Sequence, residues 1–325
     1  MALIEAKVEE KKSPRTEREE SRATALSVKN VLFATDFSAT SEAALPYATA
    51  VCRHFGSTLH IAHVMSDASI LMMTGGVDYV SLSTIYEDAH TEAKEKLEQI
   101  SGRLEGIRHL TYVRHGQVWE NLAGVVQEEG IDLIVLGTHG RSGLGKLLLG
   151  SVAENILRHA TCPVLTVGPK VSGSAKLPAF QNPRRDLAPV ELELKQIVFA
   201  TNFAENSRCV AQEAVSLAEE FGARLTMLHV IEDYSQLGRR PGPMEDGVRR
   251  LHDLIPRNAA LQHLPETLLE FGSAWKSILK ASGDREADLI VLGAVPLDNL
   301  GSTHLPSTAQ HVIAQAQCPV LTIRC

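Results

Sequence analysis

VLFATDF, at residues 31–37, recurs as IVFATNF at residues 197–203, 166 positions further along the chain. Each stretch is a run of branched and aromatic residues that ends in small and polar ones, a pattern typical of a buried strand followed by a turn. DLIVLG at residues 132–137 recurs unchanged at residues 288–293, now 156 positions later. Matches in the same order indicate one duplication, and the fall in offset from 166 to 156 means that the second copy is shorter in its middle.

Strand-like and helix-like segments alternate within each copy. In the first copy the apolar runs VLFAT, LHIAHV, LTYVRH, DLIVLG and PVLTVG are continuous, as expected of strands that are buried on both faces. Helical patterns separate them, at residues 40–55, 81–104, 119–129 and 151–159. The order β-α-β-α-β-α-β-α-β predicts an α/β fold of two tandem Rossmann-like domains, each a five-stranded, mainly parallel sheet with helices on both faces.

Composition changes along the chain predict the domain boundaries. Residues 1–27 are dense in charge and poor in large apolar side chains, so we expect a disordered tail. The first domain should span residues 28–169 and the second residues 195–325. Residues 170–194 between them carry Gly, Ser, three prolines and two arginines, which is typical of a linker.

Charge and cysteine usage exclude several classes of protein. The net charge of −7 argues against a nucleic-acid-binding surface, and no run of 18 apolar residues is available to span a membrane. The first residues have no apolar signal region, so we expect a cytoplasmic protein. Five cysteines without a C-x-x-C pair predict neither a disulfide framework nor a zinc site, and each is interpreted as a small buried apolar residue.

A glycine-rich segment follows the fourth predicted strand of the first copy. It fits the spacing G-x2-G-x9-G-[S/T] through Gly137, Gly140, Gly150 and Ser151. Ligands of open parallel sheets bind beyond the carboxyl ends of the strands, and glycines let backbone N–H groups approach an anion. Ser151 would begin a helix whose N-terminus favours negative charge. The segment therefore predicts a phosphate-binding loop, although a purely structural loop would also use glycines.

The two copies together resemble the universal stress protein family, and more closely its tandem-domain members. The resemblance rests on VLFATDFS, LHIAHV, VLGTHGRSGLGKLLLGSVAENILRHATCPVLTV and the doubling, and it covers residues 28–169 and 195–325. It implies an adenine nucleotide alpha hydrolase-like fold and an ATP ligand. It also implies pairing of the last strands, Val164–Gly168 and Val320–Arg324, so that the two halves form an internal pseudo-dimer.

The resemblance also implies which residues of the first domain contact the nucleotide. Those expected around the adenine and ribose are Ala34, Thr35, Asp36 and Val64. Those expected around the ribose and phosphates are Leu136, Gly137, Gly140, Gly150, Ser151 and Val152. His139 and Arg141 lie in the same loop, where they either contact the phosphates or remain solvated charges.

Two other observations leave alternatives open. Asp36 either binds a ribose hydroxyl or caps the helix that follows it. His63 and His229 recur at matching strand positions, which favours shared packing over catalysis.

The second copy departs from the motif. It has Asn202 in place of the aspartate, and Pro296 and Pro306 in place of two glycines. Proline offers no N–H to a phosphate and fixes its own φ. We therefore expect ATP, accompanied by Mg²⁺, in the first domain only.

These observations favour a regulatory protein of the stress response, in which bound ATP controls assembly or the binding of an unidentified protein partner; the sequence leaves a homodimer open. The sequence has no G-x4-G-K-[S/T] loop and no defensible nucleophile–base pair, so we assign no catalytic and no metal-ligating residue. Two alternatives remain: a slow ATP hydrolase or phosphotransferase using Asp36, His139 or Arg141, and an interaction module without a functional nucleotide.

Overall fold

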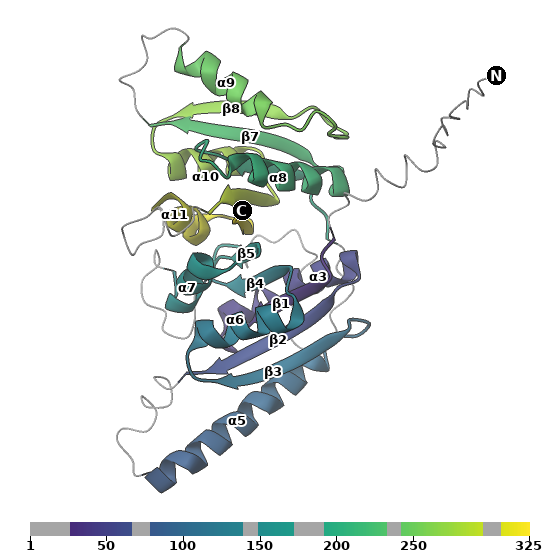
Figure 1. The fold of residues 1–325 in the computed structure, drawn as a ribbon, viewed down its shortest axis with the longest axis vertical. Coiled ribbons are helices and arrows are strands. Elements are labelled where there is room, and N and C mark those ends of the chain that lie inside the picture. Colours follow the sequence, from purple (N-terminus) through teal and green to yellow (C-terminus); the bar gives the residue numbers. More distant parts are fainter. Residues whose placement is uncertain (1–26, 67–78, 139–148, 172–191, 233–241, 295–306) are drawn as a thin grey trace, which may run out of the picture.

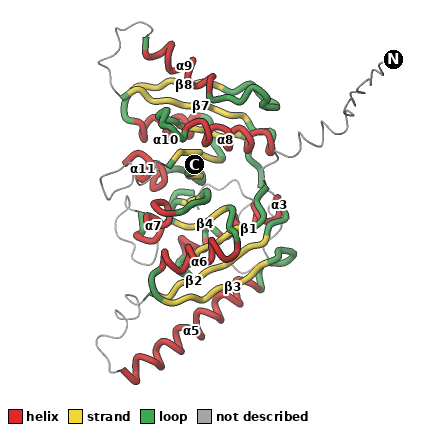
Figure 2. The backbone as a smooth tube through the Cα atoms, in the orientation of Figure 1, coloured by secondary structure: helices red, strands yellow, loops and turns green. Residues whose placement is uncertain are grey.

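The sheet runs through both halves of the chain. The computed structural model describes residues 27–66, 79–138, 149–171, 192–232, 242–294 and 307–325. The first half contributes β1 (Asn30–Ala34), β2 (Thr58–Met65), β3 (His109–His115), β4 (Leu133–Gly137) and β5 (Val164–Val167). The second contributes β6 (Gln196–Ala200), β7 (Arg224–Ile231), β8 (Glu266–Phe271), β9 (Leu289–Gly293) and β10 (Val320–Ile323). They form one sheet in the order β3-β2-β1-β4-β5-β10-β9-β6-β7-β8. Figures 1 and 2 show strands of both halves stacked along the long axis of the molecule.

Neighbouring strands within each half are parallel, as the alternating pattern predicts. The halves join where β5 and β10 pair antiparallel, with Leu321 opposite Leu165. In each half the chain leaves the first strand to one side and returns on the other, so β1 lies between β2 and β4. This is the topological switch point at which open parallel sheets form ligand sites.

Helices cover both faces of the sheet. In the first half they are α2 (Ala39–Glu42), α3 (Leu45–Phe55), α5 (Tyr79–Ser101), α6 (Val118–Glu129) and α7 (Ser151–His159). In the second half they are α8 (Ser207–Phe221), α9 (Pro243–Asp253), α10 (Ala274–Asp284) and α11 (Ser307–Gln315). The predicted helix at residues 40–55 is two helices, because Pro46 in the first turn of α3 has no N–H to continue the hydrogen bonding of α2. As predicted, α6 ends at Gly130, which is left-handed with φ 58°.

Alternate residues of the central strands enter two separate hydrophobic cores. Val31 and Phe33 of β1 pack on the face covered by α3, and that core continues into the second half. Leu32 between them packs on the opposite face, in the core of α6 and α7. These strands are buried on both sides, which is why their sequences read as continuous apolar runs.

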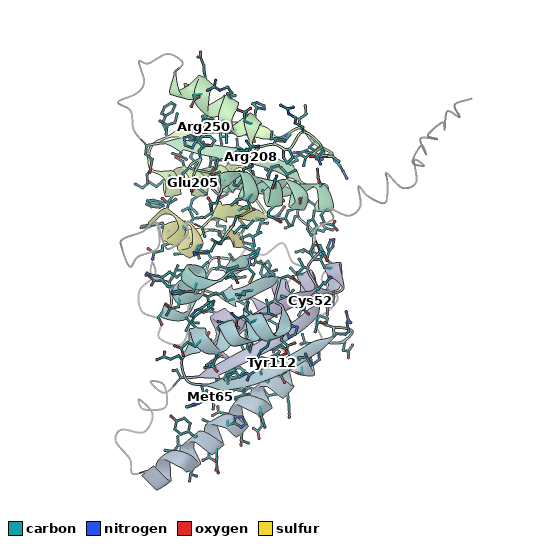
Figure 3. All side chains as sticks on the ribbon, in the orientation of Figure 1. Cys52, Met65, Tyr112, Glu205, Arg208 and Arg250 are labelled. Carbon is teal, nitrogen blue, oxygen red and sulfur yellow. A yellow bond between two sulfur atoms is a disulfide. The ribbon has the colours of Figure 1, made fainter. Side chains whose placement is uncertain are left out.

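One predicted strand is not buried in this way. LTYVRH forms β3 at an edge of the sheet, where Leu110 is 49% exposed. This strand carries Tyr112, which is labelled in Figure 3. The Tyr112 hydroxyl lies 3.0 Å from Nδ1 of His60 on the neighbouring β2. The expectation of burial on both faces was therefore wrong for LTYVRH, because an edge strand lacks a neighbour on one side and packs fewer residues.

The cysteines also differ from the prediction. Cys209 on α8 and the exposed Cys325 form a disulfide, 116 positions apart in the sequence. The interpretation of all five as buried apolar residues was wrong for this pair, because sequence spacing cannot show which thiols the fold brings together. It holds for Cys52 and Cys318, which are buried, and burial raises the pKa of the Cys52 thiol to about 12.

Candidate functional site

The carboxyl ends of β1 and β4 bring the predicted nucleotide residues of the first half together. Ala34, the last residue of β1, lies opposite Leu136 in the register of β4. On its other side Ala34 lies opposite Ala62 of β2, two positions before Val64. Residues from three separate motifs, on β1, β2 and β4, therefore meet at the carboxyl ends of these parallel strands.

The turn after β1 is held by side-chain hydrogen bonds. The Thr35 hydroxyl lies 3.0 Å from the Ser41 hydroxyl and accepts the Phe37 N–H at 3.0 Å. Oδ1 of Asp36 accepts the N–H of Ser38 at 3.0 Å. The residue that caps α2 is Ser38, whose hydroxyl accepts the Ser41 N–H at 3.2 Å. The Asp36 side chain thus stabilises the turn before α2, and the residue that caps α2 is Ser38.

A strained residue follows Asp36 in the first half and its counterpart Asn202 in the second. Phe37 has φ 61° and Phe203 has φ 60°, a left-handed conformation that costs a bulky side chain on the order of 1–3 kcal/mol. Sequence reasoning missed this feature, since nothing in VLFATDF marks a positive φ. Its recurrence in both copies means that the turn is a property of the fold and is independent of the glycine motif.

The two recurring histidines, His63 and His229, contact the turn that follows the first strand of their own half. Nδ1 of His63 lies 2.8 Å from the Thr35 carbonyl oxygen, and the His63 ring packs 4.3 Å from the Phe37 ring. His229 repeats both contacts with Thr201 and Phe203 at the same two distances. Burial lowers the pKa of His229, partly offset by its hydrogen bond to Thr201. Shared packing, as predicted, accounts for both histidines.

Gly137, the last residue of β4, lies against α2. A Cβ at this position would collide with the Thr40 carbonyl oxygen and would lie 2.9 Å from Cα of Ser41. The absence of a side chain at Gly137 therefore has a packing reason, whether or not a ligand binds beside it.

We expect Gly137→Ala to lower the free energy of unfolding by about 1–3 kcal/mol, because the backbone of α2 must move to admit the methyl group. The matched control is Gly293→Ala in the second half, where the nearest atom to a new Cβ is Cγ2 of Val210 at 3.3 Å. Urea unfolding of both variants measures the difference. Equal losses would show that close packing of α2 does not explain the glycine.

The N-terminus of α7 completes the described part of the site. Gly150 precedes the helix with φ −62° and donates its N–H to the Thr138 carbonyl oxygen at 2.9 Å. Any residue adopts this φ, so backbone conformation does not require glycine here. Ser151 and Val152 in the first turn are exposed. The first N–H groups of a helix have no partner within it, so this turn offers donors to an anion.

Part of the predicted loop cannot be placed. His139, Gly140 and Arg141 lie outside the described residues, as do Pro296 and Pro306 of the second half. Nothing in the structure therefore tests those five positions.

The corresponding edge of the second half has its own arrangement. Oδ1 of Asn202 accepts the Ala204 N–H at 3.1 Å, which repeats the turn made by Asp36. Nδ2 of Asn206 donates to the Ala294 carbonyl oxygen at 2.7 Å. A cavity of about 210 Å³ lies beside these residues. Across the described ranges, no group of three or more His, Cys, Asp or Glu side chains is placed to hold a metal ion.

Comparison with known proteins gives matches in both halves. The model of the universal stress protein family matches residues 27–168 and again residues 193–324. The universal stress protein MJ0577 of Methanocaldococcus jannaschii is 31% identical over 158 residues, which are 44% of this chain and 97% of that protein. A universal stress protein of Mycolicibacterium smegmatis is 22% identical over 309 residues, covering 90% of this chain and 96% of its own.

Among solved structures, a universal stress protein from Archaeoglobus fulgidus has the same fold along nearly the whole chain. The superposition gives a TM-score of 0.66 at 22% identity, and it covers 92% of this chain and 97% of the other. None of the helices within the described segments is long and apolar enough to cross a membrane.

Proposed function

Because the chain belongs to the universal stress protein family, with one match in each half, we propose that it is a cytoplasmic stress-response regulator whose first half binds ATP. The observation that carries the proposal is the position of the glycine motif. Its described ends, Gly137 and Gly150, lie at the end of β4 and at the start of α7. An anion held between them would lie at the switch point of the sheet.

The chemistry of these residues fits a nucleotide. The first turn of α7 supplies N–H donors and the positive end of a helix dipole for phosphates, and Gly150 presents no side chain in their way. Asp36 stands at the end of β1, where it would accept a ribose hydroxyl. Val64 and Leu136 would pack on the adenine, with Ala34 and Thr35 between them. Mg²⁺ would neutralise the phosphate charge when ATP is bound.

The second half supports the same proposal by contrast. It repeats the turn after the first strand, through Asn202, but has Pro296 and Pro306 at the two motif glycines. We therefore propose one ATP per chain, bound to residues 28–169, with residues 170–194 as linker and residues 195–325 as a non-equivalent second domain. The β5–β10 pairing would make the two an internal pseudo-dimer, through which the nucleotide acts on assembly or on a partner.

Equilibrium titration with labelled ATP tests this proposal. We expect wild-type protein to saturate at one ATP per chain and Gly140→Pro to bind at least about tenfold more weakly, because a proline N offers no donor to a phosphate. Gly143→Pro is the matched control, since Gly143 lies in the same segment but outside the motif spacing, and its affinity should stay near that of wild type.

Native mass spectrometry of freshly purified protein counts the nucleotides independently. Two ATP molecules per chain would overturn the assignment to the first half. Unchanged affinity in Gly140→Pro would overturn the loop, and absence of any adenine nucleotide would leave an interaction module. Phosphate release that depends on Asp36 would identify an ATP hydrolase instead.

A further inference from the structure

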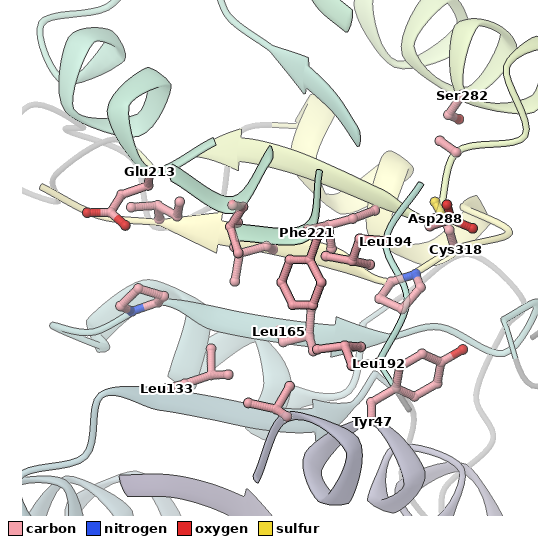
Figure 4. A pocket seen from close by; sticks show the side chains of 18 of the residues that line it. Tyr47, Leu133, Leu165, Leu192, Leu194, Glu213, Phe221, Ser282, Asp288 and Cys318 are labelled. Carbon is pink, nitrogen blue, oxygen red and sulfur yellow. The ribbon is translucent and has the colours of Figure 1, made fainter. Parts of the chain in front are cut away.

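A large, mainly apolar cavity lies between the two halves, away from the carboxyl ends of β1 and β4. Its volume is about 1490 Å³. Leu165 of β5 and Leu321 of β10, which are opposite each other in the sheet, both line it. Figure 4 shows Phe221 of α8 above Leu165, with Leu192 and Leu194 beside it. The lining of the cavity is mainly apolar, with charged and polar side chains among the apolar ones, and cavities that bind small molecules typically combine apolar walls with a few polar groups.

Two helices form matching walls of this cavity. Tyr47, Val51 and Phe55 line it from α3 at a spacing of four residues, so they share one helix face. Residues 209, 213, 217 and 221 line it from α8 at the same spacing. The helices touch at their C-terminal ends, where His54 stacks on Phe221 at 4.4 Å and Nε2 of His54 lies 3.0 Å from Oε1 of Glu220. The cavity is therefore bounded by the sheet and by two joined helices, and it is partly open to solvent.

Glu213 differs from the other charged side chains at this cavity. Five of those others are exposed, namely Lys170, Glu193, Lys195, Lys280 and Glu286. Asp132 and Asp288 accept backbone N–H groups, and Arg324 donates to the Leu157 and Arg158 carbonyl oxygens.

Glu213 occupies the position that Tyr47 holds in the first copy, 166 residues earlier. No hydrogen bond or ion pair reaches its carboxylate from the described residues, whereas Asp288 at the cavity accepts the N–H groups of Lys195 and Gln196 at 2.8 and 3.0 Å. Burial raises the pKa of the Glu213 carboxyl, and no nearby cation opposes it. A half-buried carboxylate facing apolar walls gains from a cationic partner.

We propose that this cavity binds an apolar monoamine, whose hydrocarbon body packs on the leucine and phenylalanine side chains and whose ammonium group pairs with Glu213. A fatty acid of the same length would place its carboxylate against Glu213 and be repelled. An alcohol of the same length would fill the same volume without pairing with the charge. The chemistry thus distinguishes three ligands of equal size.

Isothermal titration calorimetry with dodecylammonium, dodecanol and dodecanoate tests the proposal, with the two charged ligands kept below their micelle concentrations and dodecanol below its solubility limit. We expect one dodecylammonium per chain, bound at least about tenfold more tightly than dodecanol, with dodecanoate weakest. In Glu213→Gln, which keeps the shape and removes the charge, the amine and the alcohol should bind alike. Glu213→Tyr, which copies the first-half residue, should do the same.

Two further variants locate the binding. Leu217→Trp places a larger side chain in the cavity one helical turn from Glu213, and it should weaken the binding of both ligands. Leu264→Trp, at a position that is 97% exposed, should leave binding unchanged. Equal affinity for amine and alcohol in wild type, amine binding unaffected by Glu213→Gln, or no saturable binding of either ligand would each overturn the proposal. Gly140→Pro should bind the amine normally, which separates this site from the nucleotide site.

Discussion

Cys325→Ser should lower the free energy of unfolding by about 3–5 kcal/mol in non-reducing buffer, because it removes the disulfide to Cys209. The bond joins positions 116 residues apart. In the chain-entropy account, a cross-link that closes a loop of about 100 residues restricts the unfolded chain by about 4.7 kcal/mol, and measured values are typically lower. The bond ties the start of α8 to the chain end next to β10, the strand that joins the two halves.

Urea unfolding with and without dithiothreitol measures this effect. Wild type in the reductant should unfold like Cys325→Ser, and the reductant should not change the variant. Cys325 is exposed, so serine there leaves no cavity, and the loss reports the bond itself. Hydrogen exchange of the β10 amides should accelerate in parallel. A wild-type unfolding midpoint that is indifferent to reductant would contradict the prediction.

The three other cysteines, Cys52, Cys162 and Cys318, are unsuited to form a disulfide in place of Cys209–Cys325. Cys52 and Cys318 are buried, and burial raises the pKa of each to about 12. Desolvation also raises the pKa of Cys162, to about 11. Since the thiolate is the reactive form, these side chains stay inert near neutral pH. Thiol–disulfide exchange among the described residues is therefore expected chiefly at the Cys209–Cys325 pair.

Most of the fold could be predicted because duplication and periodicity are properties of the sequence itself. Strands such as VLFAT are buried on both faces, so nearly every residue in them is apolar and the pattern is hard to misread. LTYVRH carries Arg114 and His115 beside its apolar residues. Its place at the edge nevertheless depends on the order of strands in the sheet. The disulfide depends on the same three-dimensional information, since Cys209 and Cys325 are close only after β10 pairs with β9.

The candidate site was less predictable, because one glycine can serve packing or a ligand. At Gly137 the structure gives a packing reason, which the motif spacing could not reveal. At Gly150 the structure gives no conformational reason for a glycine, because every residue can adopt φ −62°. The strained Phe37 had no sequence signal at all, since aromatic residues rarely adopt a positive φ and the sequence does not record backbone angles.

Gly150→Pro should therefore lower the affinity for ATP strongly while changing the stability of the fold little. Proline prefers φ near −65°, so the start of α7 should survive, and the second half has proline at the matching position. The variant loses the hydrogen bond from the Gly150 N–H to the Thr138 carbonyl oxygen, at a cost of about 1 kcal/mol in stability. We expect ATP affinity to fall about 100-fold, or by about 2.8 kcal/mol, since the pyrrolidine ring occupies the approach to the first-turn amides.

Gly150→Ala is the control, because alanine keeps the N–H and adds only a methyl group at the same φ. We expect its ATP affinity to lie between those of wild type and Gly150→Pro, and its stability to match wild type. Far-UV circular dichroism and urea unfolding establish that α7 persists, and the ATP titration is then compared among the three proteins. Wild-type affinity in Gly150→Pro would mean that the phosphates do not approach α7, and the glycine spacing would then have to be explained by the loop alone.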